Sequence, residues 1–180
     1  MLLREVLTLH YTLLVGIHGV GKTTLLDNLK DDIQFTALSI SDLIRQAGNK
    51  IKSNNKFTKN IANNQELWKQ ELAAYPFHED EIVILDGHFT LLDSLGQIVE
   101  LPYSTFDGLK IDRIILKIEI PSTIQKRLMK RDKSHWDKDL IDSFQTREQK
   151  RVIEFARLEK IPLFVYDNDS KLKELKQFLL

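Results

Sequence analysis

The chain has 180 residues, of which 29% are charged and 42% apolar, and its 26 Lys and Arg balance its 26 Asp and Glu. This length suits a single domain over residues 1–180, and zero net charge argues against a general electrostatic nucleic-acid binder. The absence of cysteine excludes disulfides and thiolate metal sites, and the absence of a signal peptide or a ~20-residue apolar run predicts a cytoplasmic protein without a membrane partner.

Apolar periodicity predicts strands that alternate with helices. Residues 82–85 form a continuous apolar run, as in a strand buried on both faces, whereas residues 139–160 carry apolar side chains at helical spacing. This alternation is typical of a three-layer α/β fold, with a mainly parallel sheet of about five strands and helices on both faces. In chain order, the predicted elements are strand 9–15, helix 22–29, strand 35–39, helix 41–47, helix 65–75, strand 82–85, strand 113–120, helix 121–131, helix 139–160, strand 163–166 and helix 170–180.

Three segments are predicted to lie outside regular structure. Gly48 is expected to end the helix that begins at Ser41 and Asp42, and residues 49–64, which are rich in Asn and Lys, are typical of a surface arm. Residues 91–108 contain many turn residues and are predicted to form a loop. The charged residues 130–138 are predicted to form a flexible cover. The single domain would therefore carry an arm at about 41–75 and a short lid at about 130–138.

A glycine-rich loop between the first predicted strand and helix carries the most specific motif. The sequence Gly-Ile-His-Gly-Val-Gly-Lys-Thr of residues 16–23 fits the Walker A pattern G-x-x-x-x-G-K-[ST]. Glycines let backbone N–H groups turn toward phosphate oxygens, and the helix that follows directs its positive end at the same anion. The alternative is a chance glycine turn. The predicted nucleotide-binding residues of the loop are Gly16, His18, Gly19, Val20, Gly21, Lys22, Thr23 and Thr24.

Asp86 and His88 follow directly after the apolar strand of residues 82–85. The carboxyl ends of parallel strands face the ligand crevice, where an acid can hold Mg²⁺ or its water, or accept a proton from an attacking group. His88 could hold a water molecule or contact a phosphate. The alternatives are a turn-forming Asp before Gly87 and an ordinary loop histidine.

Arginines form the third group of candidates. Arg127 and Arg131 are four residues apart on one helix face and could hold the phosphates of a bound nucleotide, as could Arg147 and Arg151. Arg45, one turn into the helix after the second strand, could meet an anionic acceptor. The alternative for each is an ordinary solvated surface charge.

These segments together resemble the nucleoside-monophosphate kinase group of P-loop proteins. The likeness is strongest to archaeal-type adenylate kinases and adenylate-kinase-like ribosome assembly factors, and it covers most of the chain in order. Residues 16–24 resemble the phosphate loop, residues 41–45 the acceptor segment, residues 86–88 the Asp-x-His motif, residues 91–102 the stretch after it, and residues 127–131 the start of the lid.

The resemblance implies a P-loop fold and ATP- and Mg²⁺-dependent phosphoryl transfer to a nucleotide or other small phosphate acceptor. Lys22 and Arg131 would stabilise the transferred group, and Thr23 and Asp86 would position the metal. Arg127 would pack on the adenine. The catalytic residues would thus be Lys22, Asp86 and Arg131. The predicted acceptor-binding residues are Asp42, Arg45 and His88.

Two other functions also fit the sequence. The first is an ATP-dependent assembly or regulatory factor of the same fold, in which slow ATP hydrolysis switches the interaction with a protein partner. The second is a kinase that phosphorylates the end of a nucleic acid, which the Asn- and Lys-rich segment supports and the zero net charge weakens. A kinase would phosphorylate one particular acceptor, whereas a switch would release ADP slowly without any acceptor.

Overall fold

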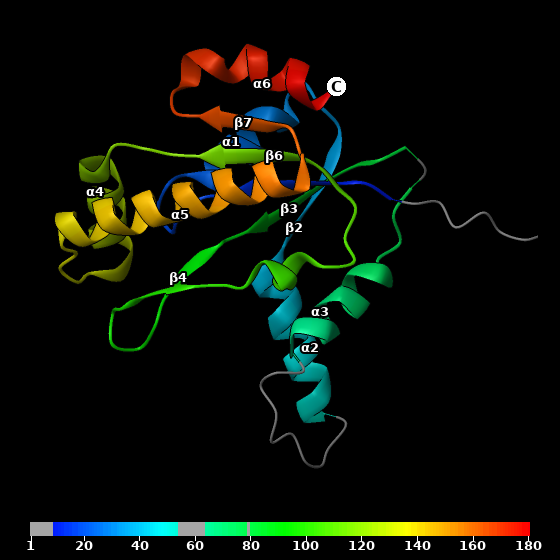
Figure 1. Ribbon diagram of the computed structural model, residues 1–180, viewed down its shortest axis with the longest axis horizontal. Helices are drawn as coiled ribbons and strands as arrows, with labels where there is room; N and C mark the ends of the chain where they lie inside the picture. The colour runs from blue at the N-terminus through cyan, green and yellow to red at the C-terminus, as the bar shows by residue number, and fades with distance from the viewer. Residues whose placement is uncertain (1–8, 54–63, 79) are drawn as a thin grey trace, which may run out of the picture.

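A five-stranded parallel sheet forms the centre of the protein, as predicted (Figure 1). The computed structural model describes residues 9–53, 64–78 and 80–180. The strand order is β2-β3-β1-β6-β7, so the strand before the glycine loop lies in the middle of the sheet. The five strands are β1 (Tyr11–Val15), β2 (Phe35–Ser39), β3 (Ile82–Gly87), β6 (Ile111–Lys117) and β7 (Leu163–Tyr166).

Helices cover both faces of this sheet, which confirms the predicted three-layer architecture. Side chains alternate along each strand, so Leu13 and Val15 face the layer of α2, α3 and α5, whereas Leu14 faces the layer of α1 and α6. Among the described residues, no helix is both long enough and apolar enough to cross a membrane. The helices are α1 (Lys22–Lys30), α2 (Ile40–Ser53), α3 (Asn64–Ala73), α4 (Pro121–Asp132), α5 (Lys138–Glu159) and α6 (Leu172–Leu179), with short 3-10 helices η2 (Tyr103–Phe106) and η3 (Asp169–Lys171).

Helix α2 differs from its prediction at both ends. It begins at Ile40, and the Ser39 hydroxyl accepts a hydrogen bond from the Asp42 backbone N–H at 3.4 Å, so Ser39 takes the capping role expected of Ser41. The helix continues through Gly48 to Ser53, so the predicted stop is wrong. Packing between α2 and α3 offsets the roughly 1 kcal/mol cost of an internal glycine. Residues 54–63 of the predicted arm lie outside the described residues.

The segment predicted as a loop over residues 91–108 contains a β-hairpin. Strands β4 (Thr90–Leu92) and β5 (Ile98–Glu100) pair antiparallel, and the chain turns between them at Gly96, which has φ +75°. The Asp93 carboxylate accepts from the backbone N–H groups of Leu95 and Gln97. The turn residues were recognised, but the strands they connect are too short for a clear alternating pattern.

The predicted lid is a short connection between α4 and α5. Residues 130–132 belong to α4, so residues 133–137 alone connect the two helices. Trp136 packs against the apolar cluster under the glycine loop, its indole N–H donates to Asp132 at 3.0 Å, and its carbonyl accepts from Gln125 at 2.7 Å. The segment therefore has an apolar anchor that its charged sequence did not predict, and its mobility stays a prediction.

Candidate functional site

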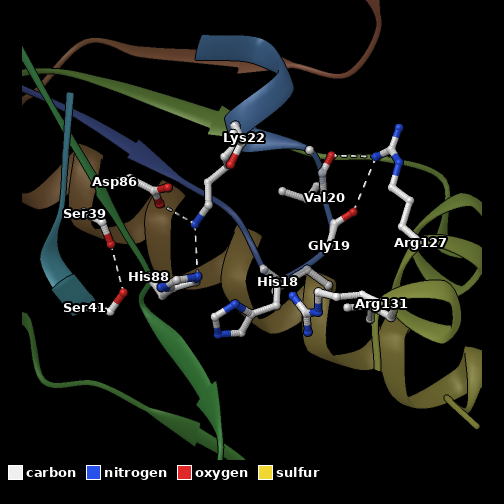
Figure 2. A pocket seen from close by; sticks show the side chains of 14 residues that line it. His18, Gly19, Val20, Lys22, Ser39, Ser41, Asp86, His88, Arg127 and Arg131 are labelled. Atoms are coloured by element: carbon white, nitrogen blue, oxygen red, sulfur yellow. Dashed lines mark hydrogen bonds and ion pairs between the residues drawn. The ribbon is translucent and has the colours of Figure 1, made fainter. Parts of the chain in front are cut away.

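A pocket of about 300 Å³ opens at the carboxyl ends of β1, β2 and β3 (Figure 2). These ends lie together because Leu14 is level with Asp86 across the β1–β3 pair, and Ser39 is level with Asp86 across the β2–β3 pair. The phosphate loop, these strand ends and helix α4 all contribute to the wall. Its lining residues are Ile17, His18, Gly19, Val20, Gly21, Lys22, Thr23, Ser39, Ser41, Asp86, His88, Arg127, Leu128 and Arg131.

The loop between β1 and α1 takes its shape from glycine. Gly16 has φ +147°, and a Cβ atom there would lie 2.4 Å from the Lys117 carbonyl oxygen, so no side chain fits. Gly19 has φ +80°, and its Cβ would lie 2.8 Å from the Leu128 side chain. The loop is thus held between β6 and α4.

Lys22 lies at the centre of the pocket, where its side chain is 8% exposed. Its ammonium group is 2.8 Å from the Asp86 carboxylate and donates to the carbonyls of Gly16 at 2.8 Å and Gly87 at 3.0 Å. Burial lowers the pKa of Lys22, and the negative charge of Asp86 offsets part of that shift. The ammonium therefore stays paired at the strand ends.

Thr23 and Asp86 provide the oxygen atoms that Mg²⁺ prefers. Thr23 is exposed at the start of α1, the Asp86 side chain is 21% exposed, and both line the same pocket. No group of three or more His, Cys, Asp or Glu placed to hold a metal occurs in residues 9–53, 64–78 and 80–180. Mg²⁺ bound with a nucleotide does not need such a group, because it keeps several waters and uses phosphate oxygens. The two residues fit a metal of that kind.

Two histidines stack beside Lys22. The rings of His18 and His88 have centroids 4.4 Å apart, and His88 Nε2 lies 3.0 Å from the Lys22 ammonium. Burial lowers the pKa of His88 well below its usual value, and the charge of Lys22 adds to this effect. Loss of hydration and the same charge also lower the pKa of His18. Both rings are therefore neutral near pH 7, and His88 Nε2 can accept a hydrogen bond from the Lys22 ammonium.

Arg127 and Arg131 both extend from α4 to the phosphate loop. Arg127 donates to the carbonyls of Val20 at 3.0 Å and Gly19 at 3.4 Å. Arg131 lines the pocket beside His18 (Figure 2). Its guanidinium group donates to both carboxylate oxygens of Asp132, at 2.6 and 3.1 Å. The predicted loop residues from His18 to Thr23 thus line the pocket together with Arg127 and Arg131, whereas Gly16 and Thr24 are not part of the lining.

Asp42 and Arg45 are not brought to the pocket. They form an ion pair with each other on exposed α2, where the Arg45 side chain is 69% exposed. Two hydroxyl groups that the sequence did not single out occupy the pocket wall here, those of Ser39 and Ser41, which lie 2.9 Å apart. The predicted acceptor role of Asp42 and Arg45 stays a prediction.

A family model described as AAA domain matches residues 15–145, well over half of the chain. The chain belongs to this AAA-domain family. None of the curated proteins matches the chain, whereas 210 chains of solved structures do. One is a gluconokinase from Sinorhizobium meliloti 1021, 13% identical, with a TM-score of 0.46, and the match covers 97% of this chain and 90% of that one. The family and the phosphate loop together support a P-loop NTPase.

Glu148 on α5 is a functional candidate that the sequence patterns did not indicate, and it lies just beyond the residues that the family model matches. Its side chain is 1% exposed, and its carboxylate accepts from the Phe89 backbone N–H at 3.0 Å and from the Thr90 hydroxyl at 2.6 Å. These bonds hold the chain directly after His88. The sequence does contain a signal for this residue. Glu148 lies between Phe144 and Val152 at helical spacing, and an acidic side chain on an apolar helix face is expected to be buried and hydrogen-bonded.

Arg147 and Arg151 on α5 contact the β4–β5 hairpin and the chain that follows it. Arg151 donates to the Leu101 carbonyl at 2.6 Å and lies over the Tyr103 ring at 3.8 Å. Arg147 donates to the Ile98 carbonyl at 3.4 Å. Neither arginine lines the pocket, so the structure gives no support to a phosphate-binding role for them.

Proposed function

We propose that the protein is an ATP- and Mg²⁺-dependent phosphotransferase that acts on a small acceptor. The observation that carries this proposal is the arrangement around Lys22, in which the phosphate loop, Asp86 and Arg131 face one pocket. Cations and loop N–H groups suit a triphosphate, and the carboxylate suits the metal and the incoming hydroxyl. This kind of catalysis depends mainly on positioning and electrostatics, so few other groups are needed.

In this proposal each side chain acts on a particular part of the reaction. Lys22 exchanges part of its pairing with Asp86 for the β- and γ-phosphates, and Arg131 turns from Asp132 to the transferred group. Arg127 holds the outer side of the loop and contacts the nucleotide. Thr23 and Asp86 would hold Mg²⁺, which would supply positive charge to neutralise the phosphates. Asp86 is also within reach of an acceptor at the strand ends.

The resemblance to nucleoside-monophosphate kinases favours a nucleotide as acceptor, which would require Asp42 and Arg45 to turn toward the pocket. An ATP-dependent switch with weak ATPase activity would use the same residues around the triphosphate. Transfer to an acceptor distinguishes the two, because a switch would consume ATP at one slow rate whatever small molecule is added.

ATP binding tests the proposal through a pair of matched variants on α1. Lys22→Met fills a similar volume without the charge, and Lys30→Met makes the same change at an exposed position of the same helix. We expect Mg²⁺–ATP at 100 times its Kd to stabilise the parent and Lys30→Met by about 2.7 kcal/mol, measured by thermal unfolding. We expect Lys22→Met to fold, to lose most of this stabilisation and to turn over no ATP. Equal ATP stabilisation and turnover in all three proteins would contradict the proposal.

A further inference from the structure

The pocket has two sides of different chemistry. Figure 2 shows Arg127 and Arg131 on one side and Ser39 and Ser41 on the other, with Lys22 between them. These three cations are the positively charged residues of the lining, as far as residues 9–53, 64–78 and 80–180 describe it. The side away from the arginines therefore has to recognise its ligand through uncharged groups and one carboxylate.

Hydroxyls, a neutral imidazole and a carboxylate meet on that side. Ser39 ends β2 in register with Asp86, and its hydroxyl lies 2.9 Å from that of Ser41. His88 is beside Asp86 at the end of the neighbouring strand, and its Nε2 lies 3.0 Å from the Lys22 ammonium, where a neutral ring accepts a hydrogen bond. Each serine hydroxyl can both donate and accept, which matches the hydrogen-bonding capacity of a hydroxyl on a ligand.

The start of α2 could in principle attract an anion, since a helix N-terminus carries partial positive charge. That position already holds a negative charge, because Asp42 lies in the first turn of α2. The Asp42 backbone N–H is bonded to the Ser39 hydroxyl at 3.4 Å. A phosphate monoester, with about −1.5 to −2 charges, would lie close to the Asp86 carboxylate there, and no arginine of the described lining is on that side to neutralise it (Figure 2).

We propose that the acceptor is an uncharged hydroxyl compound, such as a sugar, a polyol or a nucleoside, whose hydroxyl is held between Ser39, Ser41 and Asp86. This inference rests on the proposed phosphotransferase function and narrows its acceptor. The acceptor oxygen forms a bond to the γ-phosphorus of ATP, and the bond from that phosphorus to the β–γ bridging oxygen breaks. ADP leaves with the bond electrons, and the hydroxyl proton passes to the Asp86 carboxylate and then to water.

An acceptor panel tests this inference. ADP formation from Mg²⁺–ATP is measured with glycerol, ribose, glucose, myo-inositol, adenosine or uridine, and separately with AMP, CMP, GMP or UMP. Mass spectrometry of each mixture identifies any phosphorylated product. We expect at least one uncharged compound to raise ADP formation above the acceptor-free rate and to gain a phosphoryl group, and we expect no such product from the four monophosphates.

Serine variants then locate the acceptor. Ser41→Ala removes an exposed hydroxyl inside α2, and Ser143→Ala makes the same change on exposed α5, away from the pocket. Loss of one neutral hydrogen bond should raise the KM for the uncharged acceptor about 2- to 13-fold in Ser41→Ala, with the ATP Kd unchanged and Ser143→Ala like the parent. Ser39→Ala is a second variant, read together with its unfolding temperature because Ser39 also caps α2.

Three results would overturn the inference. The first is a phosphorylated nucleoside monophosphate with no reaction of the uncharged compounds. The second is no stimulation by any compound while ATP still binds. The third is an unchanged acceptor KM in both Ser41→Ala and Ser39→Ala. The proposed phosphotransferase function survives the first of these, and it fails separately if ATP does not bind or if Lys22→Met turns over ATP like the parent.

Discussion

The two sides of the pocket are built in different ways: the side with the arginines, here called the phosphate side, and the side with Ser39 and Ser41, here called the acceptor side after the proposed acceptor. The phosphate side comes mainly from one continuous segment, residues 16–23, which α4 holds in place through Arg127 and Leu128. The acceptor side combines the ends of two strands that are more than forty residues apart in the sequence, with Ser39 on one and Asp86 on the other. A local segment can be recognised by its motif, whereas an assembled wall depends on how the strands align.

The two sides also differ in charge. Lys22, Arg127 and Arg131 make the phosphate side cationic, whereas hydroxyls, histidine and carboxylate line the other. Lys22 belongs to both sides, because it is paired with Asp86 while it projects from the phosphate loop. This division predicts that substitutions on one side change ATP binding, that substitutions on the other change use of the acceptor, and that changes at the shared pair affect turnover most.

Asp86→Asn should have the largest effect on turnover among substitutions outside the loop. Asparagine keeps the shape but loses the charge that, in the proposed reaction, would hold Mg²⁺ and take up the acceptor proton, so we expect ATP turnover to fall about 10²- to 10⁴-fold. Lys22 keeps its bonds to Gly16 and Gly87, so the unfolding temperature should change by about 5 °C or less. Steady-state kinetics and thermal unfolding measure the two effects.

The control is Asp142→Asn, on an exposed position of α5 that does not line the pocket. It should behave like the parent in both measurements. If Asp86 only shapes the turn before Gly87, asparagine will substitute well and turnover will survive.

Arg127→Ala should have the second-largest effect and should act on the nucleotide alone. A charge-assisted contact is worth about 1.5–3 kcal/mol, so we expect the Kd of ATP to rise about 10- to 150-fold, measured by calorimetric titration. The acceptor KM should stay within about twofold of the parent value at saturating ATP. Arg157→Ala, on an exposed part of α5, provides the matched control. A large rise in acceptor KM would mean that the two sides are not separate.

The smallest expected effect concerns pH and His88. Because burial lowers the folded-state pKa of His88 well below 6.5, the unfolded chain binds a proton there that the folded chain does not. His88 therefore contributes stability above pH 6.5, which is lost as the pH falls toward its folded-state pKa. We expect the unfolding temperature to drop between pH 7.5 and pH 5.5, by about 2–4 °C for each kcal/mol lost.

His88→Gln should reduce this drop, whereas His135→Gln, at an exposed position, should leave it unchanged. The charged and titratable groups that face His88 are Lys22 and His18. An equal pH dependence in all three proteins would show that His88 is not the group that titrates.

Sequence patterns predicted the parts of the fold that depend on local chemistry. The five strands, the phosphate loop and α5 were all recognised, because glycine spacing and apolar periodicity are encoded within short segments. The β4–β5 hairpin was missed because each strand has only three residues. The stop at Gly48 was wrong because packing of α2 on α3 overrides the weak helix preference of glycine.

The site residues that belong to a short motif or end a buried strand were also predictable from the sequence. Lys22 and Asp86 were identified from the motif and from a strand end, and the structure brings them within 2.8 Å of each other. Ser39, Ser41 and Glu148 were not recognised, since ordinary serines and a helix glutamate gain a role only through neighbours distant in the sequence. Arg45 was expected to face the crevice from its spacing, whereas the structure shows it exposed, paired with Asp42 and outside the pocket lining, so its acceptor role stays a prediction.

The central claim is that the pocket transfers the γ-phosphoryl group of ATP, and isotope transfer measures this most directly. ATP labelled with ¹⁸O at the three terminal γ-oxygens is incubated with the protein, Mg²⁺ and the mixture of uncharged acceptors, and the products are weighed by mass spectrometry. We predict that the three labelled oxygens move together into an organic phosphate ester, and that Lys22→Met abolishes this transfer whereas Lys30→Met preserves it. Label found only in inorganic phosphate, at a rate that the acceptors do not change, would contradict the claim.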